Sequence, residues 1–275
     1  RMRLHTHVVG APSSAAPPLV FVHGWPDDSR CWQPLLPAFA SRRCVLVDLP
    51  RCDGAEWRGE DLSFSRLADL LAAALREERR GATVVAHDWG AFVAALVLAR
   101  APSLLHRLVL LDVGALPRFS RHPTLFPRAL AIASYQAVNA LIYALGRAPP
   151  LTPLADALNR RWVPLLLPAE EWYDRPVASE VNYFYFHAPS FLLSVAYEEM
   201  RAALHAPAVP LLFLYGSGYF HDRRWEEMLA SPEWPDCDAR RVAPGHWFFR
   251  SPQGASLTSA AINEWLCRTE SPGRS

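Results

Sequence analysis

The sequence has 275 residues, of which 51% are hydrophobic and 20% are charged, and its 28 lysines and arginines almost balance its 27 aspartates and glutamates. A chain of this length can bury a sizeable core as one large domain, or as a domain with an inserted lobe. The balanced charge argues against a nucleic-acid-binding or anionic-membrane surface, because such a surface needs a concentration of basic side chains.

Strand-like and helix-like segments alternate along the first part of the chain. Uninterrupted runs of Val and Leu are typical of strands buried on both faces, and the alternation of strands with helices indicates a parallel sheet. The predicted strands are residues 18–24, 43–50, 82–88 and 106–114, and the predicted helices are residues 31–40, 62–78 and 89–100. This pattern predicts an α/β architecture.

The pattern changes after Gly114. Residues 115–206 are rich in Pro, Tyr and Trp, contain helical patterns and offer no clear strand. Two strand-like runs and a final helix-like run follow, at residues 209–218, 238–247 and 256–268. The sequence therefore predicts a core domain made of residues 1–114 and 207–275, with residues 115–206 inserted as a helical lobe.

One segment of this lobe, Ala129–Gly146, is apolar enough to be compared with a membrane span. It is barely long enough to cross a bilayer, and it carries Ser134, Gln136 and Asn139 within the apolar run. We therefore expect a helix of the lobe and no membrane span.

The cysteines and the first residues bear on compartment and metal binding. Five cysteines are scattered without a CxxC spacing, at positions 31, 44, 52, 237 and 267. This pattern predicts free thiols in a reducing, cytoplasmic compartment, and the opening RMRLHTHVVG lacks the apolar stretch of a signal peptide. His5 and His7 share a strand face but have no third ligand nearby, so we expect sheet surface and no metal site.

The stretch AHDWGA, Ala86–Ala91, places a carboxylate where a buried strand passes into a helix. Charged groups avoid such places unless they are paired or functional. Small residues at Ala86 and Gly90, on either side of Asp88, match a nucleophile elbow, in which a strained turn lifts the attacking atom into a cleft. No GxSxG motif is present, which disfavours a serine esterase or lipase.

Three segments in this order resemble one known family. They are HGWPDDSRCW at residues 23–32, HDWG at residues 87–90 and PGHW at residues 244–247. With these segments the chain resembles the α/β-hydrolase family, in particular the branch with an Asp nucleophile that holds epoxide hydrolases and haloalkane and fluoroacetate dehalogenases. The resemblance implies an α/β-hydrolase fold, with a mostly parallel central sheet, helices on both faces and an inserted helical cap.

The resemblance also implies a mechanism. Asp88 would attack an electrophilic carbon to form an alkyl-enzyme ester, and His246 would activate the water that hydrolyses this ester. The backbone N–H groups of Trp25 and Trp89 would form the oxyanion hole. The expected partners are a small hydrophobic substrate and water, without a metal or organic cofactor.

His246 needs an acidic partner that orients and stabilises its charged form. Many relatives place this acid three residues beyond a Gly after the next-to-last strand, but here that position holds Tyr219, and the nearest acid is Asp222. The family's other placement follows the sixth strand, where VLLDVGALP supplies Asp112. We expect Asp112 to be the partner, with Asp222 as the alternative. His23 and His87 are expected to be structural.

The substrate class depends on donors to the leaving atom. HGWP resembles epoxide hydrolases, since many haloalkane dehalogenases have Asn where this chain has Trp25. Epoxide hydrolases use two cap tyrosines as O–H donors, and the resemblance implies Tyr135 and Tyr197 for this role. Tyr183, Tyr185 and His187, in the run NYFYFH, compete with the second of these. We expect an epoxide hydrolase. The alternatives are a hydrolytic haloalkane dehalogenase and a ligand-binding relative without turnover.

Overall fold

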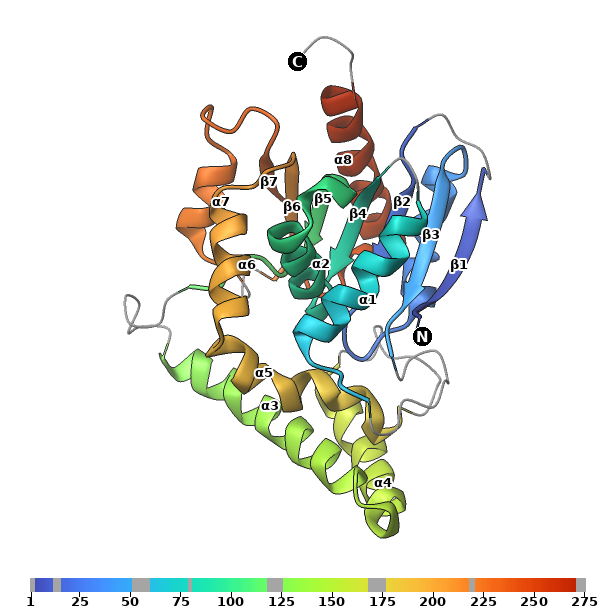
Figure 1. Cartoon of the computed structure of the whole chain (residues 1–275), viewed down its shortest axis with the longest axis vertical. Helices are drawn as coiled ribbons and strands as arrows, with labels where there is room; N and C mark the ends of the chain where they lie inside the picture. The colour runs from blue at the N-terminus through green and yellow to red at the C-terminus, as the bar shows by residue number, and fades with distance from the viewer. Residues whose placement is uncertain are drawn as a thin grey trace.

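The computed structural model of the chain describes residues 3–11, 16–50, 60–78, 81–117, 126–167, 177–217 and 221–270. Seven strands in these ranges form one sheet in the order β1-β3-β2-β4-β5-β6-β7 (Figure 1). The strands are β1 His5–Gly10, β2 Leu19–Val22, β3 Arg43–Asp48, β4 Ala82–His87, β5 Leu105–Leu111, β6 Leu211–Tyr215 and β7 Asp238–Arg241. Only β1 runs antiparallel to its neighbour, and every other pair is parallel.

The central strands are buried on both faces, as their Val and Leu runs predict. Every residue of β2 and β4 is buried, and the two strands pair in parallel with Val20 opposite Val84. The edge strand β1 is mostly exposed, which agrees with its more polar sequence. The prediction of an α/β fold with a mostly parallel sheet is therefore confirmed.

Helices cover both faces of the sheet (Figure 1). On one face lie α1 Phe64–Glu77, α2 Trp89–Arg100 and α6 Val195–His205, and on the other lies α8 Pro252–Glu270. The short helix α7, Arg223–Leu229, joins α6 through Trp225, whose indole N–H donates to the carbonyl of Leu204 at 2.7 Å. Helix α1 begins after Ser63, whose hydroxyl accepts the N–H of Arg66.

The helix predicted over residues 31–40 is wrong. The structure has two separate 3-10 turns there, η1 Ser29–Trp32 and η2 Leu36–Phe39. Pro34 and Pro37 lie between and within them, and a proline lacks the N–H that a continuous α-helix needs. Short 3-10 turns also occur at η3 Pro102–Leu104, η6 Pro149–Leu151, η7 Val163–Leu165, η9 Ser179–Asn182 and η10 Phe248–Arg250.

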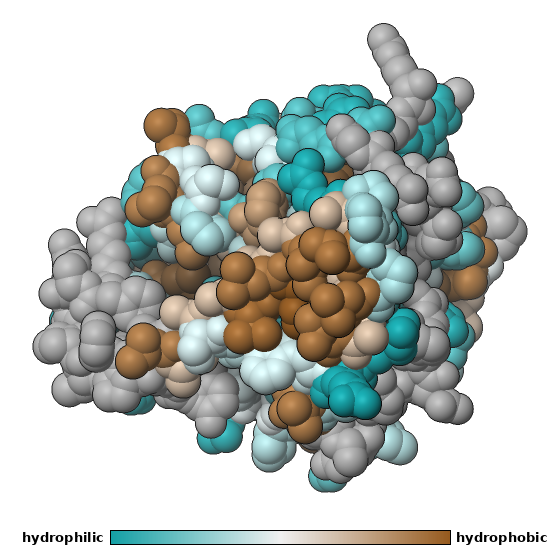
Figure 2. Space-filling model, turned by 90° about the horizontal axis from the view of Figure 1, so that it is seen from below, coloured by the Kyte–Doolittle hydropathy of each residue, from teal (hydrophilic) through white to brown (hydrophobic). Residues whose placement is uncertain are grey.

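Three further helices form a lobe beneath the carboxyl ends of the parallel strands (Figure 1). They are α3 Phe126–Gly146, α4 Thr152–Trp162 and α5 Tyr183–Leu192. Seen from this side, the molecule shows a gathering of apolar side chains (Figure 2). The exposed leucines of α3 and α4 include Leu141, Leu154 and Leu158. No helix in the described part of the chain has the length and apolarity that crossing a bilayer requires.

No disulfide links the cysteines of the described ranges, which are Cys31, Cys44, Cys237 and Cys267. Cys52 lies outside the described residues.

Candidate active site

Asp88 sits at a sharp turn between β4 and α2. Its backbone has φ 51° and ψ −128°, a conformation that L-residues rarely adopt. The turn needs small neighbours, because a Cβ added at Gly90 would lie 2.2 Å from the carbonyl oxygen of His23, and one added at Gly24 would lie 2.5 Å from Cβ of Asp88. This is the strained geometry that the sequence AHDWGA predicts.

Three side chains from separate strand ends meet at this turn. Nδ1 of His246 donates to Oδ2 of Asp112 at 2.6 Å, and Nε2 of the same ring lies 3.6 Å from Oδ1 of Asp88. The contact with Asp112 is a short hydrogen bond between charged partners. The separation from Asp88 is longer than a hydrogen bond. Asp88, His246 and Asp112 are thus brought together, with the imidazole between two carboxylates.

Asp112 is completely buried and well supplied with donors. Its Oδ1 accepts the backbone N–H groups of Gly216 and Ser217, both at 2.8 Å, and its Oδ2 accepts the Ser217 hydroxyl at 2.5 Å. Burial alone would raise the pKa of this carboxyl, but the hydrogen bonds from His246, Ser217 and Gly216 outweigh burial and lower the pKa below its usual value. The group is therefore ionised at neutral pH.

Asp222, the alternative acid, lies at the start of α7 and caps this helix. Its carboxylate accepts the N–H of Arg224 at 2.9 Å and caps the start of α7.

The charge state of His246 follows from its two carboxylate neighbours. Burial would lower the pKa of the imidazole, but the hydrogen bond to Asp112 and the negative charges of Asp112 and Asp88 outweigh burial and raise the pKa to about 10. The free protein therefore holds His246 as an imidazolium at neutral pH.

One backbone N–H group donates to the carboxylate of Asp88, and the backbone nitrogen of the next residue lies near the same loop. The N–H of Trp25 donates to Oδ2 of Asp88 at 2.8 Å. The nitrogen of Trp89 lies 2.8 Å from the position that a Cβ at Gly24 would occupy, and it belongs to the first residue of α2, whose N–H has no partner within the helix. Both residues named from the sequence as oxyanion donors therefore lie beside Asp88.

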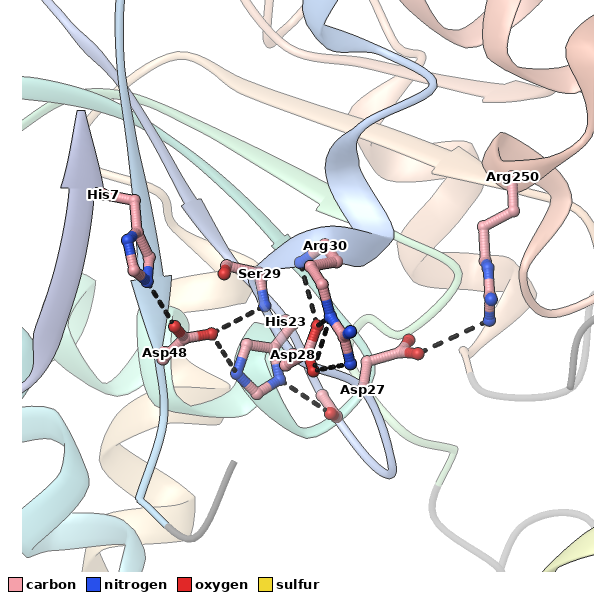
Figure 3. Close-up of polar contacts among 9 residues, drawn as sticks. His7, His23, Asp27, Asp28, Ser29, Arg30, Asp48 and Arg250 are labelled. Carbon is pink, nitrogen blue, oxygen red and sulfur yellow. Dashed lines mark hydrogen bonds and ion pairs between the residues drawn. The ribbon is translucent and has the colours of Figure 1, made fainter. Parts of the chain in front are cut away.

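The loop that carries Trp25 is fastened to β3 (Figure 3). Nε2 of His23 accepts the N–H of Leu49 at 3.0 Å, so Nδ1 carries the proton and donates to the carbonyl of Gly24 at 2.9 Å. Asp48 accepts the N–H of Ser29 at 2.7 Å and the Nε2 proton of His7 at 2.8 Å. His23 is thus a structural residue of this loop.

The same loop is also fastened to the segment that carries His246. Asp27, which is buried, accepts the indole N–H of Trp247 at 2.8 Å. Arg250 lies 3.5 Å from the same carboxylate (Figure 3). The position of Trp25 is therefore linked to that of the imidazole by one buried carboxylate.

His87, next to Asp88, is buried against the other histidine. Its ring centroid lies 4.5 Å from that of His246, and its Nε2 donates to the backbone carbonyl of His246 at 3.1 Å. Burial, followed by the positive charge of His246, lowers the pKa of His87 to about 3. It is therefore neutral and supports the His246 loop by packing and one hydrogen bond.

Two tyrosines of the lobe reach the neighbourhood of Asp88. The rings of Tyr135 and Tyr185 lie 6.0 Å apart, and Tyr185 packs edge-on against Trp25 and Trp89 at 5.1 and 5.4 Å. Burial and then the charge of Asp88 raise the pKa of Tyr135 to about 12. Burial, Tyr135 and Asp88 raise the pKa of Tyr185 well above its usual value. Both hydroxyls therefore keep their protons and can donate them.

The other two tyrosines named from the sequence have different surroundings. Tyr197 of α6 packs edge-on against Phe191 at 5.7 Å. Tyr183 is completely buried and lies against Phe184 at 4.3 Å, and since residues two apart on a helix do not share a face, it points away from the side of α5 that carries Tyr185. Tyr185 thus packs on Trp25 and Trp89, which lie beside Asp88, whereas the sequence favoured Tyr197 as the second donor.

Sequence reasoning missed two polar residues of the site. Ser217, which donates twice to Asp112, follows β6 directly within Gly-Ser-Gly, and that position at a strand end was the available signal. Asn182 accepts the indole N–H of Trp25 at 2.7 Å and precedes the aromatic run of α5 without a recognisable pattern.

The model of the alpha/beta hydrolase family matches residues 19–255 of this chain. Among curated relatives, a pimeloyl-[acyl-carrier protein] methyl ester esterase of Aeromonas hydrophila is 34% identical over 120 residues, covering 42% of this chain and 45% of that protein. Epoxide hydrolase 1 of Caenorhabditis elegans is 29% identical over 123 residues, covering 40% of this chain and 28% of that protein. The chain therefore aligns with less than half the length of either relative.

Solved structures extend the similarity to the whole fold. The haloalkane dehalogenase DbeA of Bradyrhizobium elkani USDA94 superposes with a TM-score of 0.66 at 19% identity, covering 97% of this chain and 94% of that one. At this identity the superposition establishes the fold alone. Since the family match takes in the strand before the Trp25 loop, the elbow at Asp88 and the loop of His246, the chain belongs to the alpha/beta hydrolase family.

Proposed function

We propose that this hydrolase opens a hydrophobic epoxide to a vicinal diol through an ester on Asp88. The observation that carries the proposal is the pair of tyrosines Tyr135 and Tyr185, whose rings lie 6.0 Å apart, with Tyr185 packed edge-on against Trp25 and Trp89 beside Asp88. Opening an epoxide leaves an alkoxide on carbon, and such an oxygen needs O–H donors beside the nucleophile. The aromatic surroundings of the two tyrosines suit an apolar substrate.

In the first step Oδ1 of Asp88 attacks an epoxide carbon. Oδ2 is held by the N–H of Trp25 at 2.8 Å, which leaves Oδ1 as the free nucleophile. The carbon–oxygen bond of the epoxide breaks, and the released alkoxide takes a proton from Tyr135 or Tyr185. The proton of the His246 imidazolium then restores the tyrosine, which leaves His246 neutral.

In the second step water hydrolyses the ester. Esterification removes the negative charge of Asp88, so the pKa of His246 falls and Nε2 becomes a base. Water attacks the ester carbonyl and gives a proton to His246. Oδ2 becomes the oxyanion, stabilised by the N–H groups of Trp25 and Trp89. The ester bond then breaks, His246 protonates the departing alkoxide, and the new carboxyl proton returns to His246.

Hydrolytic dehalogenation is the second candidate, favoured by the fold similarity to DbeA and by the same carboxylate chemistry. A departing halide is stabilised by N–H donors and takes no proton. Here the indole N–H of Trp25 is donated to Asn182 at 2.7 Å, so it does not point to a leaving atom. The indole donor of Trp25 is therefore engaged, which favours the epoxide over the halide.

Trapping the ester tests the proposal. A His246→Ala variant should stall before ester hydrolysis, so incubation with aryl and alkyl epoxides should add their mass to the peptide that bears Asp88. Asp88→Asn is the matched control and should show no adduct. In a single turnover in heavy-oxygen water, the native protein should incorporate the label into Asp88 and leave the diol unlabelled.

Each other outcome has a distinct meaning. Adducts from brominated alkanes alone, with release of bromide, would replace the epoxide by a halide. Saturable binding of epoxides without any adduct in the His246→Ala variant would indicate a ligand-binding protein without turnover.

A further inference from the structure

Trp25 uses both of its N–H groups, in opposite directions. The backbone N–H donates to Oδ2 of Asp88 at 2.8 Å, and the indole N–H donates to Oδ1 of Asn182 at 2.7 Å. Trp25 belongs to a loop of the sheet domain, whereas Asn182 closes the turn η9 that leads into α5 of the lobe. One residue therefore joins the carboxylate of Asp88 to the lobe.

The bond continues into the lobe through a second amide. Nδ2 of Asn182 donates to Oδ1 of Asn159 at 2.7 Å, and Nδ2 of Asn159 donates to the carbonyls of Val177 and Ala178, both at 3.0 Å. An indole N–H can only donate, so it fixes which end of each amide is the acceptor. Trp25 is 4% exposed and both asparagines are 0% exposed, so water cannot replace a lost partner.

The same turn of helix that holds Trp25 also carries the tyrosine. Asn182 and Tyr185 are three residues apart and share a face of the chain as it enters α5. Asn182 takes the indole N–H of Trp25, and the ring of Tyr185 packs edge-on against the indole at 5.1 Å. The hydrogen bond between Asn182 and the Trp25 indole therefore fixes the position of Tyr185 relative to the backbone N–H of Trp25.

We propose that Asn182 is a positioning residue that fixes the spacing between two donors acting in different steps. One is the hydroxyl of Tyr185, which serves the opening step, and the other is the N–H of Trp25, which serves ester hydrolysis. The assignment of these steps rests on the proposed function. The effect of Asn182 on the position of the Trp25 backbone N–H is argued from hydrogen bonds and does not depend on the reaction. Through Trp25, Asn182 links the lobe to the carboxylate of Asp88.

Asn182→Leu removes both hydrogen bonds and keeps the number and branching of side-chain heavy atoms. Losing an oxyanion donor outright lowers kcat about 10²- to 10³-fold, so a displaced donor should cost about 10- to 100-fold. The loss should fall on the rates of ester formation and ester hydrolysis, measured by rapid quenching and mass spectrometry, while KM changes little. In a Trp25→Phe background, which lacks the indole N–H, Asn182→Leu should have almost no further effect on either rate.

Asn139→Leu is the matched control. Asn139 is also 0% exposed and accepts an indole N–H, that of Trp162, at 3.1 Å within the lobe. Its substitution should lower the melting temperature to a comparable degree and leave both rates close to those of the parent protein. Equal rate losses in the Asn139→Leu and Asn182→Leu variants would overturn the proposal, because Asn182 would then be a structural residue only.

A second readout does not depend on the substrate. In amide NMR spectra, Asn182→Leu should shift the backbone N–H resonance of Trp25 and speed its exchange with water, whereas Asn139→Leu should leave both unchanged. An unchanged Trp25 resonance in the Asn182→Leu variant would overturn the proposal. If the native protein turns over no epoxide, the proposed function fails, and the resonance of Trp25 still decides the role of Asn182.

Discussion

Nδ1 of His246 donates to Oδ2 of Asp112 at 2.6 Å, and Asp112 lies directly after β5, with φ 61° and no exposed surface. The acidic partner of the imidazole therefore comes from the middle of the sheet rather than from the loop before α7. Three further donors surround this carboxylate, from Gly216 and Ser217, so its charge is stabilised without water.

Asp112→Asn should therefore impair turnover far more than Asp222→Asn. An amide at position 112 cannot stabilise the imidazolium, and the comparable substitution in a serine protease triad lowers kcat about 10⁴-fold. Asp222→Asn keeps a side chain that can cap α7, so its turnover and melting temperature should stay near those of the parent protein. Steady-state kinetics of the two purified variants makes the comparison, and the reverse ranking would assign the role to Asp222.

Removing single hydroxyls should separate the tyrosines. Tyr135→Phe and Tyr185→Phe should each slow epoxide opening, by about 10²- to 10⁴-fold if the hydroxyl is the general acid. Tyr197→Phe and Tyr183→Phe should leave that step nearly unchanged, since their rings pack against Phe191 and Phe184. The measurement is the rate of ester formation on Asp88 in the His246→Ala background. A large effect of Tyr197→Phe and none of Tyr185→Phe would reverse the assignment.

The two buried histidines predict a stability maximum near pH 6.5. The pKa of His87 falls from 6.5 to about 3 on folding, so between these two pH values the unfolded chain binds more protons than the folded protein. The free energy of unfolding therefore decreases as the pH drops through this range. The pKa of His246 rises from 6.5 to about 10 on folding, so between these two pH values the folded protein binds more protons than the unfolded chain. The free energy of unfolding therefore decreases as the pH rises through this range. Each limb has a limiting slope of about 1.4 kcal/mol per pH unit.

Urea unfolding at a series of pH values measures both limbs. His87→Gln should flatten the acid limb, and Asp112→Asn should flatten the alkaline limb because it removes a carboxylate that holds the proton on His246. An alkaline limb that persists unchanged in Asp112→Asn would contradict this account of the His246 charge.

Gly24→Ala should damage activity through contact with the nucleophile. The added Cβ would lie 2.5 Å from Cβ and 2.6 Å from Oδ2 of Asp88, so the carboxylate must move. A displacement of about 1 Å at a reacting group can cost about 10²-fold in rate. Gly146→Ala is the control, since its Cβ would meet the Ser179 hydroxyl at 2.6 Å in the lobe, and turnover should stay close to the parent's. Similar losses in both variants would point to general destabilisation.

The sheet could be predicted from the sequence because strands buried on both faces leave uninterrupted Val and Leu runs. Such runs also bring their carboxyl ends to one edge, which is why Asp88 and Asp112 end up near the loop of His246. The failures are local. Prolines broke the expected helix over residues 31–40, and β7 ends at Arg241 because the rest of the predicted strand holds Pro244 and the positive φ of Gly245.

The lobe tyrosines could not be ranked from the sequence for a physical reason. Tyr183 and Tyr185 both lie on α5, and which of them faces Asp88 depends on how the helix is rotated about its axis. That rotation is set by tertiary contacts, among them the bond between Asn182 and the indole of Trp25. A single sequence does not show which two residues pair in such a contact.

The lobe leaves the sheet after β5 and the chain returns through α6 to β6, which is the direct neighbour of β5, with Leu108 opposite Leu211. A crossover of β5, α6 and β6 is already complete without α3, α4 and α5. The register of β5 and β6 therefore does not depend on these three helices, and the lobe reaches the Trp25 loop through the bond of Asn182 to the indole.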